Sequence, residues 1–209
     1  MQTSTESQRA ARYVAVGNTL VTAAFCVVFL GPLIRFWGAV YGPLRPFDYP
    51  QADVAPSWPM FAGIVAVCVL PRVLPRAWFG RADGPSAMKW YVALGVRRFR
   101  RAATNGDWIN KRARAVAPRH RVIGNAEDFE RVSRETTQSE LAHLVLLVAG
   151  VLSAAYALVI GWYGWAAALT LGNVIFNAYP VMLQRYNRSR LHAVESAFSR
   201  RSADYSTKR

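Results

Sequence analysis

The stretch 141-LAHLVLLVAGVLSAAYALVI-160 decides the fold, because it runs for 20 residues without Asp, Glu, Lys or Arg. At a rise of about 1.5 Å per residue, a helix of this length matches the thickness of the hydrocarbon core of a bilayer. The link 161-GWYG-164 follows, and a second apolar run continues over 165–183. So short a link makes the two helices antiparallel neighbours, and its aromatic residues are typical of a membrane interface. The sequence therefore predicts a transmembrane hairpin with spans at about 141–160 and 165–183.

Two further apolar runs precede this hairpin, at about 14–37 and 58–74. The first resembles a signal peptide, but its length and the absence of a clear cleavage site favour a retained anchor. The second is short and is ended by Pro71, so we expect it to cross the membrane, with a re-entrant course as the alternative. The predicted fold class is an all-α integral membrane protein with about four transmembrane helices, forming a single membrane domain over residues 1–209.

The distribution of charge sets the expected orientation of the chain. The net charge is +14, and the loop 72–140 holds 15 Lys and Arg against seven Asp and Glu, while the tail 185–209 holds seven against two. Basic segments next to spans stay in the cytoplasm and attract anionic lipids, so both termini are expected to be cytoplasmic in a multi-pass protein of the cell membrane. This placement makes anionic membrane lipids the expected partners, and nucleic acid is not expected.

The basic loop contains one stretch with amphipathic periodicity, 86-SAMKWYVALGVRRFRR-101. Met88, Tyr91, Val96 and Phe99 recur at helical spacing, and most of the basic residues lie off that stripe. We expect an interfacial helix between spans two and three, lying in the headgroup layer. The alternative is a soluble helix whose stripe packs against a neighbouring domain.

The polar residues of the hairpin lie at the cytoplasmic ends of both spans. On the second span, Asn173, Asn177, Gln184 and Arg188 step by three or four residues and so share one face. On the first span, Glu140 and His143 share a face, and counting outward from the turn puts Glu140 level with Gln184 and His143 level with Val181. Pro180 is expected to free the backbone carbonyl of Phe176, and Gly150 should allow the helices to approach closely.

This convergence of polar groups at one depth favours a site, although each group has a plainer interpretation. The arginines could be topology anchors, and the asparagines and the histidine could be structural. As a site, His143 could take a proton from an attacking hydroxyl with Glu140 as its partner, while Arg185 or Arg188 binds a phosphate, a carboxylate or an oxyanion. The Glu-x-x-His pair offers too few carboxylates for a metal site, so none is predicted. The two cysteines, Cys26 and Cys68, suggest neither a disulfide framework nor a zinc site.

Three segments together resemble one protein family: 135-ETTQSELAHL-144, 177-NAYPVMLQRYNRSRL-191, and the basic segment that starts at Lys89. The family is that of the glycosyl-4,4′-diaponeurosporenoate acyltransferases, small membrane proteins of staphyloxanthin-type carotenoid biosynthesis. The resemblance covers roughly 89–191, with Ser189 where the family often has Pro and a more basic linker over 97–128. The polar residues that it shares with the family are Glu135, Glu140, His143, Asn177, Gln184, Arg185, Tyr186, Asn187, Arg188 and Arg190, together with Pro180.

The resemblance implies transfer of a fatty acyl group to a hydroxyl of a glycosylated carotenoid or another glycolipid or isoprenoid lipid. His143 and Glu140 are the candidate catalytic residues, and the remaining shared polar residues are candidate substrate contacts: Glu135, Asn177, Gln184, Arg185, Tyr186, Asn187, Arg188 and Arg190. No cofactor is expected, because an acyl thioester would serve as a substrate. The alternative is a non-catalytic small membrane subunit of a lipid-processing or transport complex. A membrane protein partner or a homo-oligomer remains open.

Overall fold

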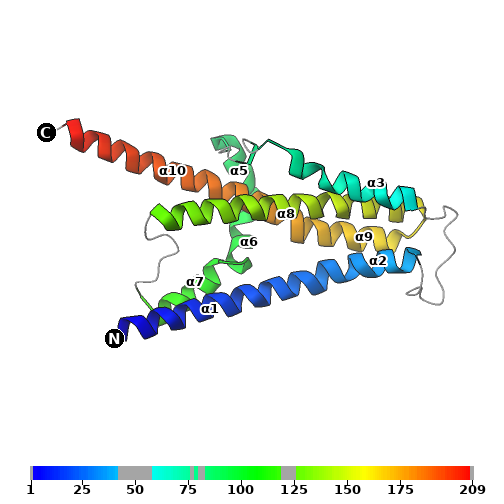
Figure 1. The fold of residues 1–209 in the computed structure, drawn as a ribbon, viewed down its shortest axis with the longest axis horizontal. Coiled ribbons are helices and arrows are strands. Elements are labelled where there is room, and N and C mark those ends of the chain that lie inside the picture. The colour runs from blue at the N-terminus through cyan, green and yellow to red at the C-terminus, as the bar shows by residue number, and fades with distance from the viewer. Residues whose placement is uncertain (1, 42–57, 76–77, 80–82, 119–125, 208–209) are drawn as a thin grey trace.

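The computed structural model describes residues 2–41, 58–75, 78–79, 83–118 and 126–207. Every regular element in these ranges is a helix (Figure 1). Three of the described helices are long and apolar enough to cross a membrane, and they span Thr5–Tyr41, Glu127–Val159 and Tyr163–Ala193. The chain is therefore an all-helical, multi-pass membrane protein.

The first long helix consists of α1 (Gln2–Phe25), a π-helical turn η1 (Cys26–Leu30) and α2 (Gly31–Tyr41). It confirms the predicted apolar helix at 14–37 and extends it in both directions. The extension at its start has a packing reason, since Ala10 and Val14 lie against Ala113 and Ala117 of the basic loop.

The second and third long helices form the hairpin. They are α8 (Ala126–Val159) and the continuous series α9 (Tyr163–Asn173), π-helical η3 (Val174–Ala178) and α10 (Tyr179–Thr207). Gly161 occupies the turn with φ 75°, a conformation that glycine adopts without steric cost. Its backbone N–H donates to the carbonyl of Leu158 at 3.1 Å, which closes the end of α8.

Both hairpin helices extend further beyond the apolar spans than the sequence predicted. The residues before Leu141, expected to belong to the loop, form the first turns of α8. Ion pairs at i,i+4 support these polar turns, with Arg131 3.5 Å from Glu135 and Arg134 3.8 Å from Glu130. Apolar content marks where a helix enters the membrane, and it says little about where the helix begins.

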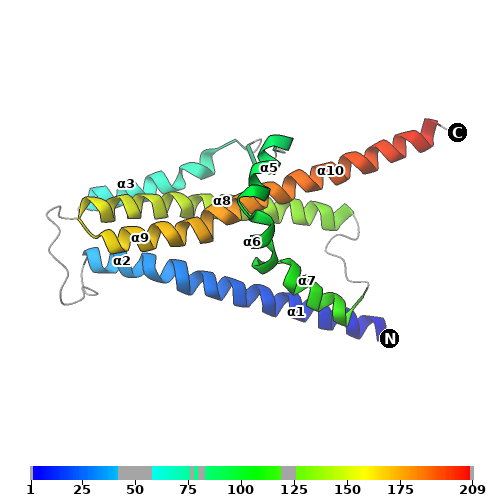
Figure 2. The same cartoon turned by 180° about the vertical axis from the view of Figure 1, so that it is seen from behind.

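A shorter apolar helix, α3 (Trp58–Val69), continues into the 3₁₀ turn η2 (Leu70–Val73). Figures 1 and 2 show α3 lying along α8, and none of its side chains is buried. The helix thus lies on the outside of the bundle, and its own residues are apolar all around its circumference.

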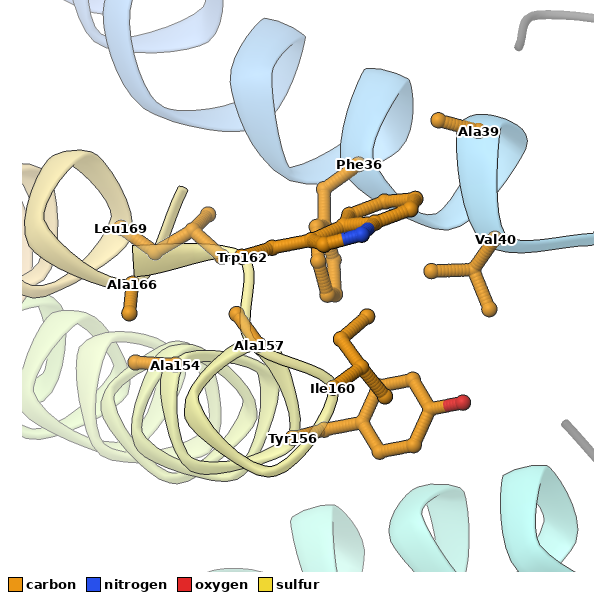
Figure 3. Packing of buried hydrophobic residues seen from close by; sticks show 10 residues of the cluster. All are labelled: Phe36, Ala39, Val40, Ala154, Tyr156, Ala157, Ile160, Trp162, Ala166 and Leu169. Carbon is orange, nitrogen blue, oxygen red and sulfur yellow. The ribbon is translucent and has the colours of Figure 1, made fainter. Parts of the chain in front are cut away.

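The apolar core lies at the hairpin turn, where α2 meets α8 and α9. Figure 3 shows Phe36 of α2 against Trp162 of the turn, with Tyr156 of α8 and Ile160, the first residue after it, beside them. The Phe36 and Trp162 rings meet edge to face, with centroids 6.0 Å apart. Trp37 adds a polar link, since its indole N–H donates to Ser153 Oγ at 2.9 Å. These contacts hold the first long helix against the hairpin.

The basic segment forms three short helices: α5 (Pro85–Ala93), α6 (Val96–Ala102) and α7 (Asp107–Val116). The single helix expected over 86–101 is broken at Gly95, which has φ 79°. The predicted stripe packs against α10, where buried Val96 and the partly buried Met88, Tyr91 and Phe99 lie in one apolar cluster with Leu183 and Tyr186. The stripe therefore packs on the protein itself, and the outward face of α5 exposes Trp90 and Leu94 instead.

The three short helices cross one end of the bundle from α10 to α1 (Figures 1 and 2). Asn18 of α1 joins them, since its amide exchanges two hydrogen bonds with Asn105, at 2.7 and 2.8 Å. The N-terminus and the C-terminus lie at this same end, while the α8–α9 turn lies at the other.

Candidate functional site

The centre of the site is a carboxylate that two arginines share. Glu140 of α8 is fully buried, and its two oxygens accept hydrogen bonds from Arg185 Nε, at 2.8 Å, and from Arg188. Arg188 is also buried, whereas the Arg185 side chain remains 26% exposed. Buried charges need such partners because their desolvation is costly. The sequence suggested a pair between Glu140 and His143, and the structure shows Glu140 paired with the arginines.

Two further contacts fix the ends of this cluster. Gln184 Nε2 donates to Ser139 Oγ at 3.1 Å, one residue before Glu140. The Arg185 guanidinium stacks over the Trp78 ring at 5.2 Å, which is a cation–π contact. Trp78 thus brings the segment before α5 to the same site.

A second polar link joins the basic segment to α10. The backbone N–H of Asp83 donates to Ser189 Oγ at 2.9 Å, and the Tyr91 hydroxyl donates to Asp83 Oδ2 at 2.5 Å. Burial, together with the Asp83 carboxylate, raises the pKa of Tyr91 from 10.0 to about 12. Tyr91 therefore stays a neutral hydrogen-bond donor at physiological pH, as the link requires.

His143 lies one turn further into the membrane along α8 and heads a chain of amides. Its Nδ1 is 3.3 Å from Asn177 Oδ1, Asn177 Nδ2 donates to Asn173 Oδ1 at 2.7 Å, and Asn173 Nδ2 donates to the Leu147 carbonyl at 2.9 Å. Both asparagines are buried. A Cβ at Gly150 would overlap the Asn173 amide, so the absence of a side chain there makes room for the amide.

Two π-helical turns meet around the imidazole. Phe25, just before η1, contacts the His143 ring edge to face at 5.7 Å and the Phe176 ring of η3 at 5.9 Å. The backbone carbonyl of Phe176, which Pro180 cannot bond because it has no N–H, also interacts with the imidazole. Such π-helical turns inside α-helices are frequent at functional sites.

The other predicted contacts lie at different places around α10. Tyr186 is buried in the apolar cluster against α6, and the Arg190 guanidinium lies 5.9 Å from its ring centroid. Arg190 is exposed and Asn187 is half-buried. Glu135 lies outside the cluster, exposed and paired with Arg131.

The hairpin agrees with the predicted register at the arginines, but the partner of His143 differs from the expected one. Glu140 lies level with residues 184 and 185, as expected. His143 meets Asn177, where Val181 was expected, a difference of about one helical turn. Deeper in the hairpin the helices still face each other in the predicted register, because a Cβ at Gly150 would meet Asn173, one residue from its expected partner. The His143 imidazole and the Asn177 amide therefore reach each other along the helix axes.

Sequence reasoning missed four residues that complete the site: Trp78, Asp83, Tyr91 as a polar contact, and Phe25. Trp78 and Asp83 belong to a stretch without periodicity, so no pattern indicated that it returns to α10. Asn173 was recognised as part of the polar stripe, but its bond to the Leu147 carbonyl depends on Gly150 in the facing helix.

The arrangement provides a base and two cations that solvent reaches. His143 has a nitrogen besides the one that faces Asn177, and Arg185 and Arg190 are accessible to an anionic group. Among the described residues, no three His, Cys, Asp or Glu side chains are grouped so that they could hold a metal ion. These groups suit proton transfer and anion binding at the membrane boundary.

Comparison with known proteins identifies one family. Residues 75–196 match the family model of glycosyl-4,4′-diaponeurosporenoate acyltransferase, which is more than half of the chain and includes the whole arginine cluster, His143 and Asp83. Neither a curated protein nor a solved structure matches the chain.

Proposed function

Since the chain belongs to the glycosyl-4,4′-diaponeurosporenoate acyltransferase family, we propose that it transfers a fatty acyl group from a thioester to a sugar hydroxyl of a glycosylated carotenoid. Family membership supports the reaction and the substrate class. The observation that carries the assignment to a site is His143, held by Asn177 one turn from the Glu140–arginine cluster.

The depth of the site suits a reaction between a substrate in the bilayer and a substrate dissolved in water. An acceptor with an apolar carotenoid body and a sugar head would lie in the bilayer with its head at the cytoplasmic boundary. The apolar span of α8 ends at Glu140, and the basic segment packs over the same level. A thioester from the cytoplasm would therefore meet the sugar next to His143.

The chemistry needs one base. The hydroxyl oxygen of the acceptor forms a bond to the thioester carbonyl carbon as its proton passes to His143. The carbon–sulfur bond then breaks, and the leaving thiolate takes that proton. A positioned base of this kind contributes about 10²–10⁴-fold to the rate.

The remaining predicted residues divide by exposure. Arg185 and Arg190 are accessible and would bind the anionic part of a substrate, with Gln184 and Asn187 beside them. Glu140 and Arg188 are buried and would hold the Arg185 guanidinium in place. Glu140 thus acts through the arginines, and His143 takes its orientation from Asn177.

The test is a pair of histidine variants in a strain that makes the glycosylated carotenoid and lacks its own acyltransferase. We expect the wild-type chain to restore the acylated pigment, His143→Gln to reduce it by about 100-fold or more, and His192→Gln to retain it. His192 is the matched control because it lies on α10, beyond the arginine cluster. Pigment acylation by mass spectrometry is the readout, with membrane insertion checked in parallel.

An inserted His143→Gln protein that restores the acylated pigment fully would overturn the proposal. A non-catalytic subunit predicts a different result, since even the wild-type chain would then leave the pigment of this strain without an acyl group.

A further inference from the structure

The amide chain behind His143 has a direction, and that direction bears on which imidazole nitrogen carries a proton. The chain runs from the Leu147 carbonyl through Asn173 and Asn177 to His143 Nδ1. An asparagine amide has one oxygen that accepts and one nitrogen that donates, so each link limits the next.

The Leu147 carbonyl fixes the first link, since it can only accept a hydrogen bond. Asn173 must therefore present Nδ2 to it, at 2.9 Å, and Asn173 Oδ1 is left to face Asn177. Asn177 then presents its own Nδ2 to that oxygen, at 2.7 Å, which leaves Asn177 Oδ1 facing His143. The reverse orientation would place two oxygens against each other at Leu147 and is excluded electrostatically.

We propose that Asn173 and Asn177 are positioning residues that hold neutral His143 with the proton on Nδ1 and leave Nε2 as the nitrogen that accepts the substrate proton. The acceptor Asn177 Oδ1 faces Nδ1 at 3.3 Å, and an acceptor there requires an N–H. The role in catalysis rests on the proposed function, while the tautomer does not.

Burial makes the arrangement rigid. Asn177 is fully buried and Asn173 is 3% exposed, so neither amide can exchange its partner for bulk water. Gly150 contributes from the facing helix, because any side chain there would overlap the Asn173 amide. Gly150 is thereby the third member of the positioning set.

The tautomer can be read directly by nuclear magnetic resonance. The chain has only three histidines, so protein labelled with ¹⁵N-histidine in lipid nanodiscs gives three imidazole patterns in a long-range proton–nitrogen correlation. The imidazole pattern that disappears in the spectrum of His143→Gln is the pattern of His143. At a pH where the ring is neutral, we expect Nδ1 to be protonated and Nε2 to be unprotonated.

Glycine variants in the same hairpin give a matched comparison. Gly150→Ala should displace the Asn173 amide and abolish the preference for the Nδ1–H form, as should Asn177→Leu. Gly164→Ala should leave the His143 pattern unchanged, since a Cβ there meets nothing within 4 Å. In an acylation assay, Asn177→Leu should lower kcat more than it raises KM, because the substrate contacts remain.

The Phe176 carbonyl provides the competing outcome. If it held the ring through Nε2–H, wild-type His143 would show the opposite tautomer, and the proposal would be wrong. It would also be wrong if folded Asn177→Leu protein kept a pure Nδ1–H pattern. The spectrum is recorded without substrate, so it would stand even if the chain proved not to be an acyltransferase. Likewise, the opposite tautomer would leave the acyltransferase assignment unaffected.

Discussion

Glu140 shows how a single side chain organises the end of the hairpin opposite the α8–α9 turn. It is fully buried, and it accepts from both Arg185 and Arg188. In such a buried group the net gain over an apolar core is small, but removal of one charge leaves the others without compensation. The carboxylate is therefore expected to matter for stability as well as for the site.

Glu140→Gln should lower the free energy of unfolding by about 3–5 kcal/mol, because two buried or half-buried guanidinium groups lose their counter-charge. The matched control is Glu135→Gln on the same helix, which is exposed and should change the stability by less than about 1 kcal/mol. Denaturant titration in detergent micelles measures both. Equal stability of the two variants would refute a central role for Glu140.

Tyr91 provides a prediction that depends on pH. Its pKa is raised to about 12 by burial and the Asp83 carboxylate, so its neutral form is favoured in the folded state. The stability that this contributes is complete below pH 10, the ordinary value, and is lost as the pH rises towards 12.

Absorbance titration of phenolate in the wild-type protein and in Tyr91→Phe isolates this group by difference. The difference should titrate near pH 12. A difference step near pH 10 would mean that the Tyr91–Asp83 link does not persist in the membrane protein.

At residue scale, the sequence predicted which side chains converge and misassigned some of their partners. Helical spacing was enough to bring Glu140, Gln184 and the arginines to one depth. It was not enough to pair His143, because its imidazole reaches the Asn177 amide about one turn away from the residue that the count places opposite it. Arg185 and Ser189 also contact Trp78 and Asp83, and no periodicity in the sequence indicated that these two residues lie near α10.

Among the elements, α5 and α6 show that an apolar stripe does not reveal what covers it. The stripe of the basic segment was predicted from its spacing, and the expected cover was the lipid headgroup layer. In the structure Val96 is fully buried and lies in one apolar cluster with Leu183 and Tyr186 of α10. The headgroup layer remains the expected environment of the opposite face, where Trp90 is 68% exposed.

Val96→Asp should release α5 and α6 from α10, because it places a charge in a buried apolar cluster. Trypsin should then cut faster at the neighbouring arginines 97–101. Trp90→Asp is the control, since Trp90 is exposed, and its cleavage rate should stay within about twofold of wild type. Similar acceleration in both variants would show that the segment does not dock through Val96.

The helix boundaries illustrate the same limit. The apolar runs located the membrane-crossing parts of α1–α2, α8 and α9–α10. They could not show that the polar turns before Glu140 and after Leu183 continue the same helices, since ion pairs support the first of these turns and contacts with α6 support the second.

For the whole molecule, we expect four crossings of the membrane from the arrangement of its ends. The two termini and helices α5–α7 lie at one end of the bundle, and the α8–α9 turn lies at the other (Figures 1 and 2). Helix α3 with η2 would then be the remaining crossing, at about 26 Å from the rise of α- and 3₁₀-helices, which is slightly shorter than a typical hydrocarbon core. Thinning of the bilayer would accommodate such a span.

Cysteine labelling tests this topology after Cys26 and Cys68 are replaced by Ala. Tyr163→Cys, in the exposed hairpin turn, should react in intact cells with a maleimide that cannot cross membranes. Ser86→Cys, exposed at the start of α5, should react only after the cells are permeabilised. Reaction of Ser86→Cys in intact cells would contradict a cytoplasmic basic segment and the crossing by α3.

The most direct test of the central claim is acyl transfer by the purified chain alone. The wild-type protein in lipid nanodiscs would receive a long-chain acyl thioester and a glycosylated carotenoid, and mass spectrometry would follow the products. The account predicts one acyl ester on the sugar for each thiol released, and a loss of about 100-fold or more in His143→Gln. Folded wild-type protein that releases no thiol and forms no ester with these substrates would contradict it.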